Sequence, residues 1–247
     1  MPAILISVNI QVNNRLSNQA RVFDDRKHAG KVLAEMLNSF SNTDALLLAI
    51  PSGGIPVAVE IAEVLGLELD VIPVSKILFP WTTESGFGAV AFDGTTWLND
   101  AAIKYYGLDE KSVEEATRQA ADKIQRRLEL FHGKRLFSRT ASRTVILVDD
   151  GIASGYTIRT GVEALHKAGM KNIVVAVPTA SANSLNEIAK LADVVYCANV
   201  REGHHFAVAD AYRNWTDVDE NEAASIFSRF RNKSSAAKST WADTIIP

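Results

Sequence analysis

The feature that most constrains the fold is an alternation of helical stretches with short apolar runs, of which only the second holds a charged residue, Asp70. The apolar runs cover residues 45–50, 69–74, 145–148, 173–177 and 194–198. Strands that are apolar at every position are typical of parallel sheets that are buried on both faces. The sequence therefore predicts an α/β fold, with a parallel sheet of about five core strands and helices on both faces.

The stretches between these runs have the spacing of amphipathic helices. Helices are expected over residues 25–40, 55–65, 110–131, 184–191 and from Thr157 onward, with Gly66 and Gly133 as two of the stops. Residues 81–99 interrupt the alternation with short strand-like pieces. We expect one domain with two terminal extensions, of which the C-terminal one is a frayed tail. The expected ranges are 21–230 for the domain, 79–100 for a flap, 199–216 for a candidate hood, and 1–20 and 231–247 for the extensions.

Composition and charge exclude several classes of protein. The net charge of the 247 residues is −3, so no basic surface indicates nucleic-acid binding. No apolar run approaches the roughly 20 residues that span a bilayer, and the first residues lack the pattern of a secretory signal. A cytoplasmic protein without membrane contact is expected. The single Cys197 excludes an intrachain disulfide framework and a multi-cysteine zinc site, and we expect it to be a buried apolar residue.

The stretch VILVDDGIASGYTIRTGVEAL, residues 145–165, combines a strand, a small loop and the start of a helix. In parallel sheets, ligands bind where strands lead into helices. Ala153, Ser154 and Gly155 leave the backbone N–H groups at the helix start accessible, which suits a phosphate. The hydroxyls of Ser154 and Thr157 would add donors.

Asp149 and Asp150 would repel that phosphate, so they are expected to face another part of the same ligand. Carboxylates accept hydrogen bonds from hydroxyls or bind a divalent cation. A phosphate beside a vicinal diol describes ribose 5-phosphate. The structural alternative, an Asp-Gly turn followed by a helix cap at Ser154, leaves Asp149 without a role.

VILVDDGIASGYT resembles the phosphoribosyl pyrophosphate motif of type I phosphoribosyltransferases. The resemblance implies that the catalytic Asp149 and Asp150 bind the ribose hydroxyls. It implies a 5-phosphate site that consists of Ala153, Ser154, Gly155, Tyr156 and Thr157. It also implies Mg²⁺ as the cofactor, held mainly by the ligand and water, with Asp149 and Asp150 as candidate protein ligands.

Two further strand ends match the order of the family's motifs. Ser52, Gly53 and Gly54 follow the first core strand, where the family holds pyrophosphate through backbone amides. Lys76 is placed at the end of the second strand, where the family often has a catalytic basic residue that reaches the pyrophosphate. A plain turn capped by Ser52 and a solvated lysine are the structural alternatives.

The resemblance extends over residues 21–227. The segments VFDDRKHAGKVLAEML and ESGFGAVAFDGTTWLND, with the long helix after them, resemble a subgroup of predicted phosphoribosyltransferases whose acceptor is undefined. Within the first segment, Asp24, Asp25 and Arg26 are expected to cap and charge a helix start.

The family's reaction transfers ribose 5-phosphate from phosphoribosyl pyrophosphate to a nitrogenous acceptor, here expected to be a nucleobase, and releases pyrophosphate. Members that use 6-oxopurines have an acidic residue where this chain has Ala153, which favours adenine, a pyrimidine or another acceptor. Phe206, Tyr212 and Trp215 are candidates to stack on the acceptor, with local core packing as the alternative. His204 and His205 could assist a proton transfer or be solvated.

Other functions stay open at this point. A regulatory protein could bind phosphoribosyl pyrophosphate without turnover, and another Mg²⁺-dependent α/β phosphoryl-transfer protein would leave IASGYT unexplained. The resemblance also implies a homodimer, in which a basic residue of one subunit approaches the other's pyrophosphate. Lys134, Arg135, Arg139 and Arg143 are candidates for that contact, although a solvated linker explains them equally well.

Overall fold

The computed structural model describes residues 9–131, 142–203 and 206–242. Within these residues the main sheet has six parallel strands in the order β1-β9-β8-β7-β2-β3. They are β1 (Ile10–Val12), β2 (Leu46–Ala49), β3 (Glu68–Val71), β7 (Thr144–Val148), β8 (Asn172–Ser181) and β9 (Val194–Arg201). The predicted α/β architecture is confirmed. The additional strand β1 comes from the segment expected to be an N-terminal extension, and it pairs with β9 at the edge of the sheet.

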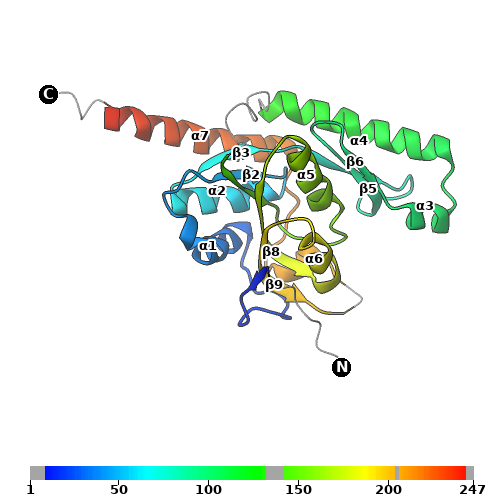
Figure 1. The fold of residues 1–247 in the computed structure, drawn as a ribbon, viewed down its shortest axis with the longest axis horizontal. Coiled ribbons are helices and arrows are strands. Elements are labelled where there is room, and N and C mark those ends of the chain that lie inside the picture. Colours follow the sequence, from blue (N-terminus) through cyan, green and yellow to red (C-terminus); the bar gives the residue numbers. More distant parts are fainter. Residues whose placement is uncertain (1–8, 132–141, 204–205, 243–247) are drawn as a thin grey trace.

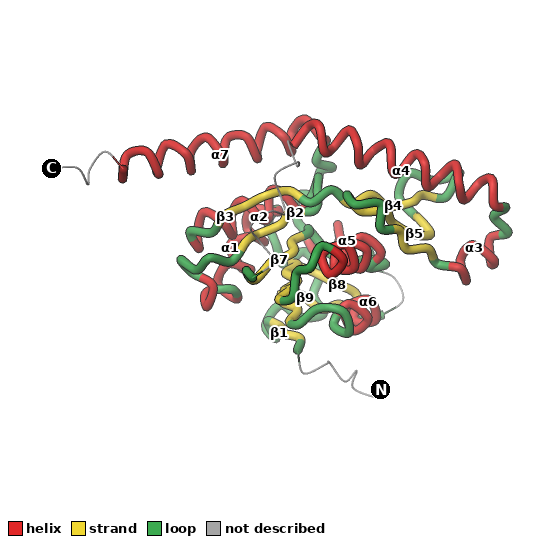
Figure 2. The backbone as a smooth tube through the Cα atoms, turned by 45° about the horizontal axis from the view of Figure 1, so that its top comes forward, coloured by secondary structure: helices red, strands yellow, loops and turns green. Residues whose placement is uncertain are grey.

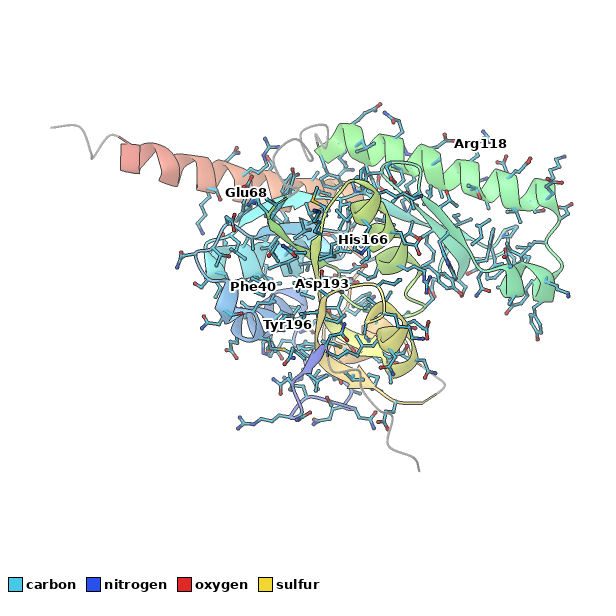
Figure 3. The ribbon with its side chains drawn as sticks, viewed as in Figure 1. Phe40, Glu68, Arg118, His166, Asp193 and Tyr196 are labelled. Atoms are coloured by element: carbon cyan, nitrogen blue, oxygen red, sulfur yellow. The ribbon has the colours of Figure 1, made fainter. Side chains whose placement is uncertain are left out.

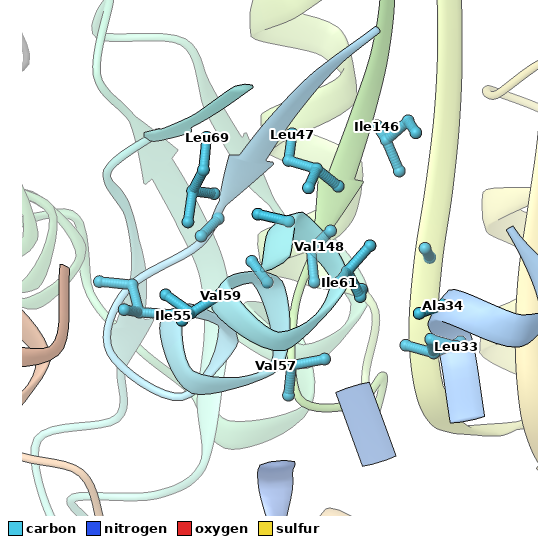
Figure 4. Packing of buried hydrophobic residues seen from close by; sticks show 14 of the residues in the cluster. Leu33, Ala34, Leu47, Ile55, Val57, Val59, Ile61, Leu69, Ile146 and Val148 are labelled. Atoms are coloured by element: carbon cyan, nitrogen blue, oxygen red, sulfur yellow. The ribbon is translucent and has the colours of Figure 1, made fainter. Parts of the chain in front are cut away.

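Helices cover both faces of this sheet, as Figures 1 and 2 show. One face packs against α1 (Arg26–Met36), α2 (Gly54–Leu65) and α7 (Glu220–Ala242), and the other against α5 (Tyr156–Lys167) and α6 (Ala182–Ile188). Successive strand residues point to opposite faces of the sheet. Leu47 therefore packs in the core on the side of α1, α2 and α7, and Leu48 in the core on the side of α5 and α6. In Figure 4, Leu33 and Ile61 lie among the residues that fill the space between the sheet and α1 and α2.

A second sheet stands beside the main one. It contains the antiparallel strands β4 (Val74–Leu78), β5 (Gly86–Ala91) and β6 (Thr96–Leu98), followed by α3 (Asp100–Tyr106) and α4 (Glu110–Phe131). We call residues 74–131 the antiparallel unit. Its core contains Ile77, Phe87 and Ile124, and α4 lies along the sheet in Figure 1. Figure 3 labels Arg118, an exposed residue of α4 that pairs with Glu115.

Two expectations about individual segments were wrong, and a third was right in its strands. The single strand predicted over 69–74 is divided at Pro73, because proline lacks the N–H that a central strand donates; β3 stays in the main sheet and β4 starts the second. In the segment of the expected flap, residues 79–100, the strand-like pieces are present as β5 and β6 of the second sheet, and the loop over 79–85 connects β4 with β5. The expected frayed tail is helical as far as Ala242, the end of α7.

Two further expectations concerned membrane-spanning segments and the environment of Cys197. Among the described residues, no helix is both long and apolar enough to span a bilayer. Cys197 is buried in β9, and burial raises its pKa to about 12, so the thiol stays protonated at neutral pH.

Candidate functional site

Two adjoining cavities lie at the carboxyl ends of the neighbouring strands β2 and β7. The larger one, the main cleft, has a volume of about 1450 Å³, and the smaller one, the side pocket, about 520 Å³. Residues that line both cavities are Lys123, Arg127, Val208, Trp215 and Asp217. The main cleft exceeds the roughly 300–1,000 Å³ of common ligand pockets, so it can hold a ligand larger than a single base.

The loop from Ala153 to Thr157, the phosphate loop, lies at one end of the main cleft. Ala153 and Thr157 line the cleft, and α5 begins after Gly155, whose φ is +81°. None of the backbone N–H groups from Ala153 to Thr157 donates to an acceptor in the part of the chain that the structure describes. Free donors at a helix start suit an anion.

Hydrogen bonds to β8 and α6 fix the position of this loop. Ile152 N–H donates to Thr179 O at 2.9 Å, and Ser184 Oγ donates to Ala153 O at 2.6 Å. A Cβ on Gly155 would meet its nearest neighbours at 3.6 Å, an ordinary contact. Glycine is therefore needed there for its left-handed backbone conformation.

The side chain of Tyr156 leads away from the loop, toward the antiparallel unit. Its ring lies 4.8 Å from that of Trp97, and its hydroxyl accepts a hydrogen bond of 2.7 Å from Asn99 Nδ2. Only the backbone of Tyr156 therefore belongs to the phosphate loop. Ser154 is exposed but does not line either cavity.

The two adjacent carboxylates face different cavities. Asp149 lines the main cleft and Asp150 the side pocket. Burial raises the pKa of Asp149 well above its ordinary value, and the charge of Asp150 raises it further. The Asp150 N–H, which donates to Asp149 Oδ1 at 2.9 Å, and the Lys76 ammonium act in the opposite direction. Asp149 is thus a partly buried carboxyl group in the wall of the main cleft, beside the phosphate loop.

Asp150 is paired within the protein. Arg26 Nε donates to Asp150 Oδ2 at 2.8 Å, and Arg26 also donates to Thr216 O at 2.7 Å. The same guanidinium lies 3.9 Å from the centre of the Trp215 ring. Burial raises the pKa of Asp150, while the charge of Arg26 offsets part of that increase. The expected helix cap is present, since Asp25 accepts from His28 N–H, but the sequence reasoning missed the role of Arg26.

The loop from Pro51 to Gly54, the glycine loop, packs directly on Asp150. A Cβ on Gly53 would lie 2.0 Å from Asp150 Oδ2, so only glycine fits there. Ser52 and Gly53 line the side pocket, and their N–H groups have no acceptor among the described residues. The alternative of a helix capped by the Ser52 side chain is not observed.

Lys76 lies within β4 of the antiparallel unit, because Pro73 separates β4 from the main sheet. The expected position at the end of a core strand was therefore wrong. Its Nζ donates to Glu84 O at 2.9 Å, and its side chain lines the main cleft. The structure thus places Lys76 with Asp149, and it places Ser52 and Gly53 with Asp150.

The three candidate acceptor residues separate into two kinds. Phe206 and Trp215 line the main cleft. Tyr212 is 3% exposed, packs against Phe23 with ring centroids 5.6 Å apart, and donates its hydroxyl to Asp150 O at 2.7 Å. The expectation that Tyr212 stacks on an acceptor was wrong, because its ring is buried. His204 and His205 lie outside the described residues.

The expected hood over 199–216 is only partly a cover for the cleft. Residues 199–201 belong to β9, and the short helix Val208–Ala211 follows. The other cover is α4, whose cleft-facing side chains sequence reasoning also missed: Lys111, Ser112, Glu115, Ala116, Gln119, Ala120, Lys123, Arg126 and Arg127. The i, i+4 spacing of Gln119, Lys123 and Arg127 was the available signal.

Of the four basic residues expected at a subunit contact, three stay untested and one has partners within the chain. Lys134, Arg135 and Arg139 lie outside the described residues. Arg143 is used within the chain, where it donates to Glu68 Oε2 at 2.9 Å and to two backbone carbonyls.

Comparisons with known proteins agree with this geometry. The family model of the phosphoribosyl transferase domain matches residues 98–212. Two curated proteins of Mycobacterium tuberculosis, strains CDC 1551 and H37Rv, both bear the name "Putative phosphoribosyl transferase" and are 34% identical over 209 residues, 85% of this chain. The chain spans about half of their length, 47%.

A solved structure extends the agreement to the fold. The crystal structure of the protein TT1426 from Thermus thermophilus is 32% identical, with a TM-score of 0.63, over 84% of this chain and 98% of that one. The similarity therefore covers most of the described fold. Together with the family model and the curated relatives, these observations show that the chain belongs to the type I phosphoribosyltransferase family.

Proposed function

We propose that this chain transfers the phosphoribosyl group of phosphoribosyl pyrophosphate to a nitrogenous acceptor and releases pyrophosphate. The observation that carries the proposal is the main cleft, which combines the unpaired N–H groups of the phosphate loop with Asp149 and Lys76. The loop matches the 5-phosphate and Asp149 the hydroxyls of that ligand, while Lys76 and the glycine loop of the adjoining side pocket offer positive groups to its pyrophosphate.

Separate groups of residues would bind the 5-phosphate and the ribose of the ligand. The phosphate loop and the Thr157 hydroxyl bind the 5-phosphate, and Asp149 accepts a hydrogen bond from a ribose hydroxyl. The reaction breaks the bond between C1 and the pyrophosphate oxygen, which keeps the electron pair, and forms a bond between C1 and the acceptor nitrogen. Positive charge develops on the ribose ring meanwhile, and the Asp149 carboxylate stabilises it.

Mg²⁺ is part of this proposal. Among the described residues, no group of three or more histidine, cysteine, aspartate or glutamate side chains is arranged to hold a metal ion. Asp149 fits as a single oxygen ligand, because Asp150 is paired with Arg26. When bound with pyrophosphate, the ion would neutralise charge on the leaving group.

The acceptor would occupy the part of the main cleft beside Phe206 and Trp215, where aromatic rings can stack on a base. Ala153 provides no carboxylate for a base proton in the phosphate loop. We therefore propose adenine, a pyrimidine or another nitrogenous compound rather than a 6-oxopurine.

A panel of nucleobases, incubated with the chain, phosphoribosyl pyrophosphate and Mg²⁺, tests the proposal. Pyrophosphate release and the mass of a new nucleotide are measured together, so that hydrolysis is distinguished from transfer. Asp149→Asn is the control, and it should abolish the product. Tight binding of phosphoribosyl pyrophosphate without a product from any base would favour the regulatory alternative.

A further inference from the structure

The long helix α4 brings two cations to the junction of the two cavities. Lys123 and Arg127, one turn apart, line both the main cleft and the side pocket. Arg127 is buried, and it donates to Val74 O at 2.9 Å and to Glu220 Oε1 at 2.8 Å. These bonds fix α4 over the junction and leave Lys123 beside it.

Lys123 is a cation without a protein partner. Its side chain is half-buried, and it forms no hydrogen bond or ion pair within the described parts of the chain. Burial lowers the pKa of Lys123, and the neighbouring charges of Arg127 and Arg126 lower it further. Glu220 attracts Lys123, but its carboxylate is already bonded to Arg127. A second anion would relieve this repulsion.

The opposite wall of the side pocket offers donors to the same anion. Ser52 and Gly53 line this pocket with N–H groups that have no acceptor among the described residues. Lys76, the basic residue expected to serve the pyrophosphate, lines the main cleft only. Lys123 therefore lines the same cavity as Ser52 and Gly53, and Lys76 does not.

The carboxylates of the side pocket are largely engaged. Asp150 is paired with Arg26 and Glu220 with Arg127, while Asp219 accepts a 2.8 Å hydrogen bond from Glu222 N–H. Asp217 is exposed and lines both cavities. Within the described residues, none of these carboxylates forms an ion pair with Lys123, and Asp217 is the one side-pocket carboxylate without a partner.

We propose that Lys123, placed by Arg127, binds the pyrophosphate of phosphoribosyl pyrophosphate against the glycine loop. The chain then supplies this cation from its own helix α4 and needs none from a partner subunit. This inference rests on the proposed function. When the bond to C1 breaks, the electron pair stays on the pyrophosphate oxygen, and the ammonium of Lys123 stabilises the growing negative charge without transferring a proton.

Calorimetry with two probes at fixed Mg²⁺ tests the inference. Lys123→Ala should weaken the binding of inorganic pyrophosphate about ten- to a hundredfold and that of ribose 5-phosphate less than about threefold. Lys123→Arg should restore most of the pyrophosphate affinity. Arg118→Ala is the matched control, because Arg118 is an exposed cation of the same helix that lines neither cavity, and it should change neither affinity.

Different failures are distinguishable. Equal losses for the two probes, or none in Lys123→Ala, would overturn the role of Lys123 and leave the proposed function intact. If the parent chain bound neither probe, both proposals would be wrong. The measurement is made at a concentration where ultracentrifugation shows a monomer. If pyrophosphate bound only to a dimer, the proposal that one chain provides the cation by itself would be wrong. Lys123→Gln, which keeps the length of the side chain, repeats the test if the alanine variant is unstable.

Discussion

The two walls of the site hold a ligand in different ways. The wall built by the main sheet offers backbone N–H groups in two short loops, and small residues give access to them. The wall built by the antiparallel unit offers charged side chains, Lys76 on β4 and Lys123 on α4. The first wall depends on close packing, so substitutions there should disturb the fold. The second depends on charge, so substitutions there should change binding and leave stability nearly unchanged.

The largest effect is expected at Arg26, which belongs to the first wall. Arg26→Ala leaves Asp150 buried without its partner, and loss of one member of a buried ion pair costs roughly 3–5 kcal/mol of folding free energy. Urea denaturation would measure this change. The double variant Arg26→Gln, Asp150→Asn should recover part of the loss, and an unchanged stability of Arg26→Ala would show that Asp150 is not held by Arg26.

The next effect is expected in the glycine loop. Gly53→Ala places a Cβ against the Asp150 carboxylate, and such overpacking typically costs about 1–3 kcal/mol. The thermal midpoint should fall and the binding of phosphoribosyl pyrophosphate should weaken together. Ser52→Ala, which removes only a hydroxyl, is the control for stability. A fully stable Gly53→Ala variant would contradict the close approach of this loop to Asp150.

Asp149 belongs to the first wall by position, but its substitution should mainly change ligand binding, as expected for the charged residues of the second wall. Asp149→Asn should weaken the binding of ribose 5-phosphate about tenfold, because the ribose hydroxyl then donates to a neutral amide oxygen in place of a charged carboxylate. Calorimetry measures this loss. An unchanged affinity would remove Asp149 from the ribose site.

The raised pKa of Asp149 gives the same substitution a pH-dependent effect on stability. An acid whose pKa is raised in the folded state binds its proton more tightly there. It contributes full stability below its ordinary pKa of 3.8, and this contribution is lost as the pH rises through the folded-state pKa. The stability of Asp149→Asn relative to the parent should therefore increase as the pH rises from 4 toward neutral, as measured by unfolding at several pH values. A decrease over that interval would mean that the carboxylate is stabilised in the folded protein.

The smallest effect is expected where the two walls meet. Tyr156→Phe removes the hydrogen bond from Asn99, which should cost about 0.5–1.5 kcal/mol of folding free energy. Asn99→Ala would lose the cap of α3 in addition and should be less stable than Tyr156→Phe. Equal stability of the phenylalanine variant and the parent would show that this bond does not join the two parts.

The sequence predicted the parts of the site that are local in the chain. The strand, loop and helix around Asp149 needed only neighbouring residues, since apolar strand residues, a left-handed glycine and a helix start follow one another within residues 145–165. The position of Lys76 was wrong because one residue, Pro73, moved its strand to another sheet. A proline inside an apolar run was the signal for that break.

The missed residues depend on contacts between distant segments. Arg26 meets Asp150 across 124 positions, and Arg127 meets Glu220 across 93. No spacing rule connects such positions, because their proximity follows from the order of strands and from the path of α7. The burial of Tyr212 is of the same kind, since its ring packs on Phe23 near the start of the domain.

The helical form of the second wall has a consequence for binding thermodynamics. Proteins that fold a loop over a ligand lose conformational entropy equivalent to roughly 1–2 kcal/mol for each backbone residue that becomes ordered. In this chain α4 is a continuous helix of 22 residues, packed through Ile124 into the core of the antiparallel unit. The backbone of the lysine at the junction is therefore preorganised, so that only its side chain loses conformational entropy when an anion binds there. Rigid diphosphate analogues should consequently bind with a small entropic penalty and a small change in heat capacity.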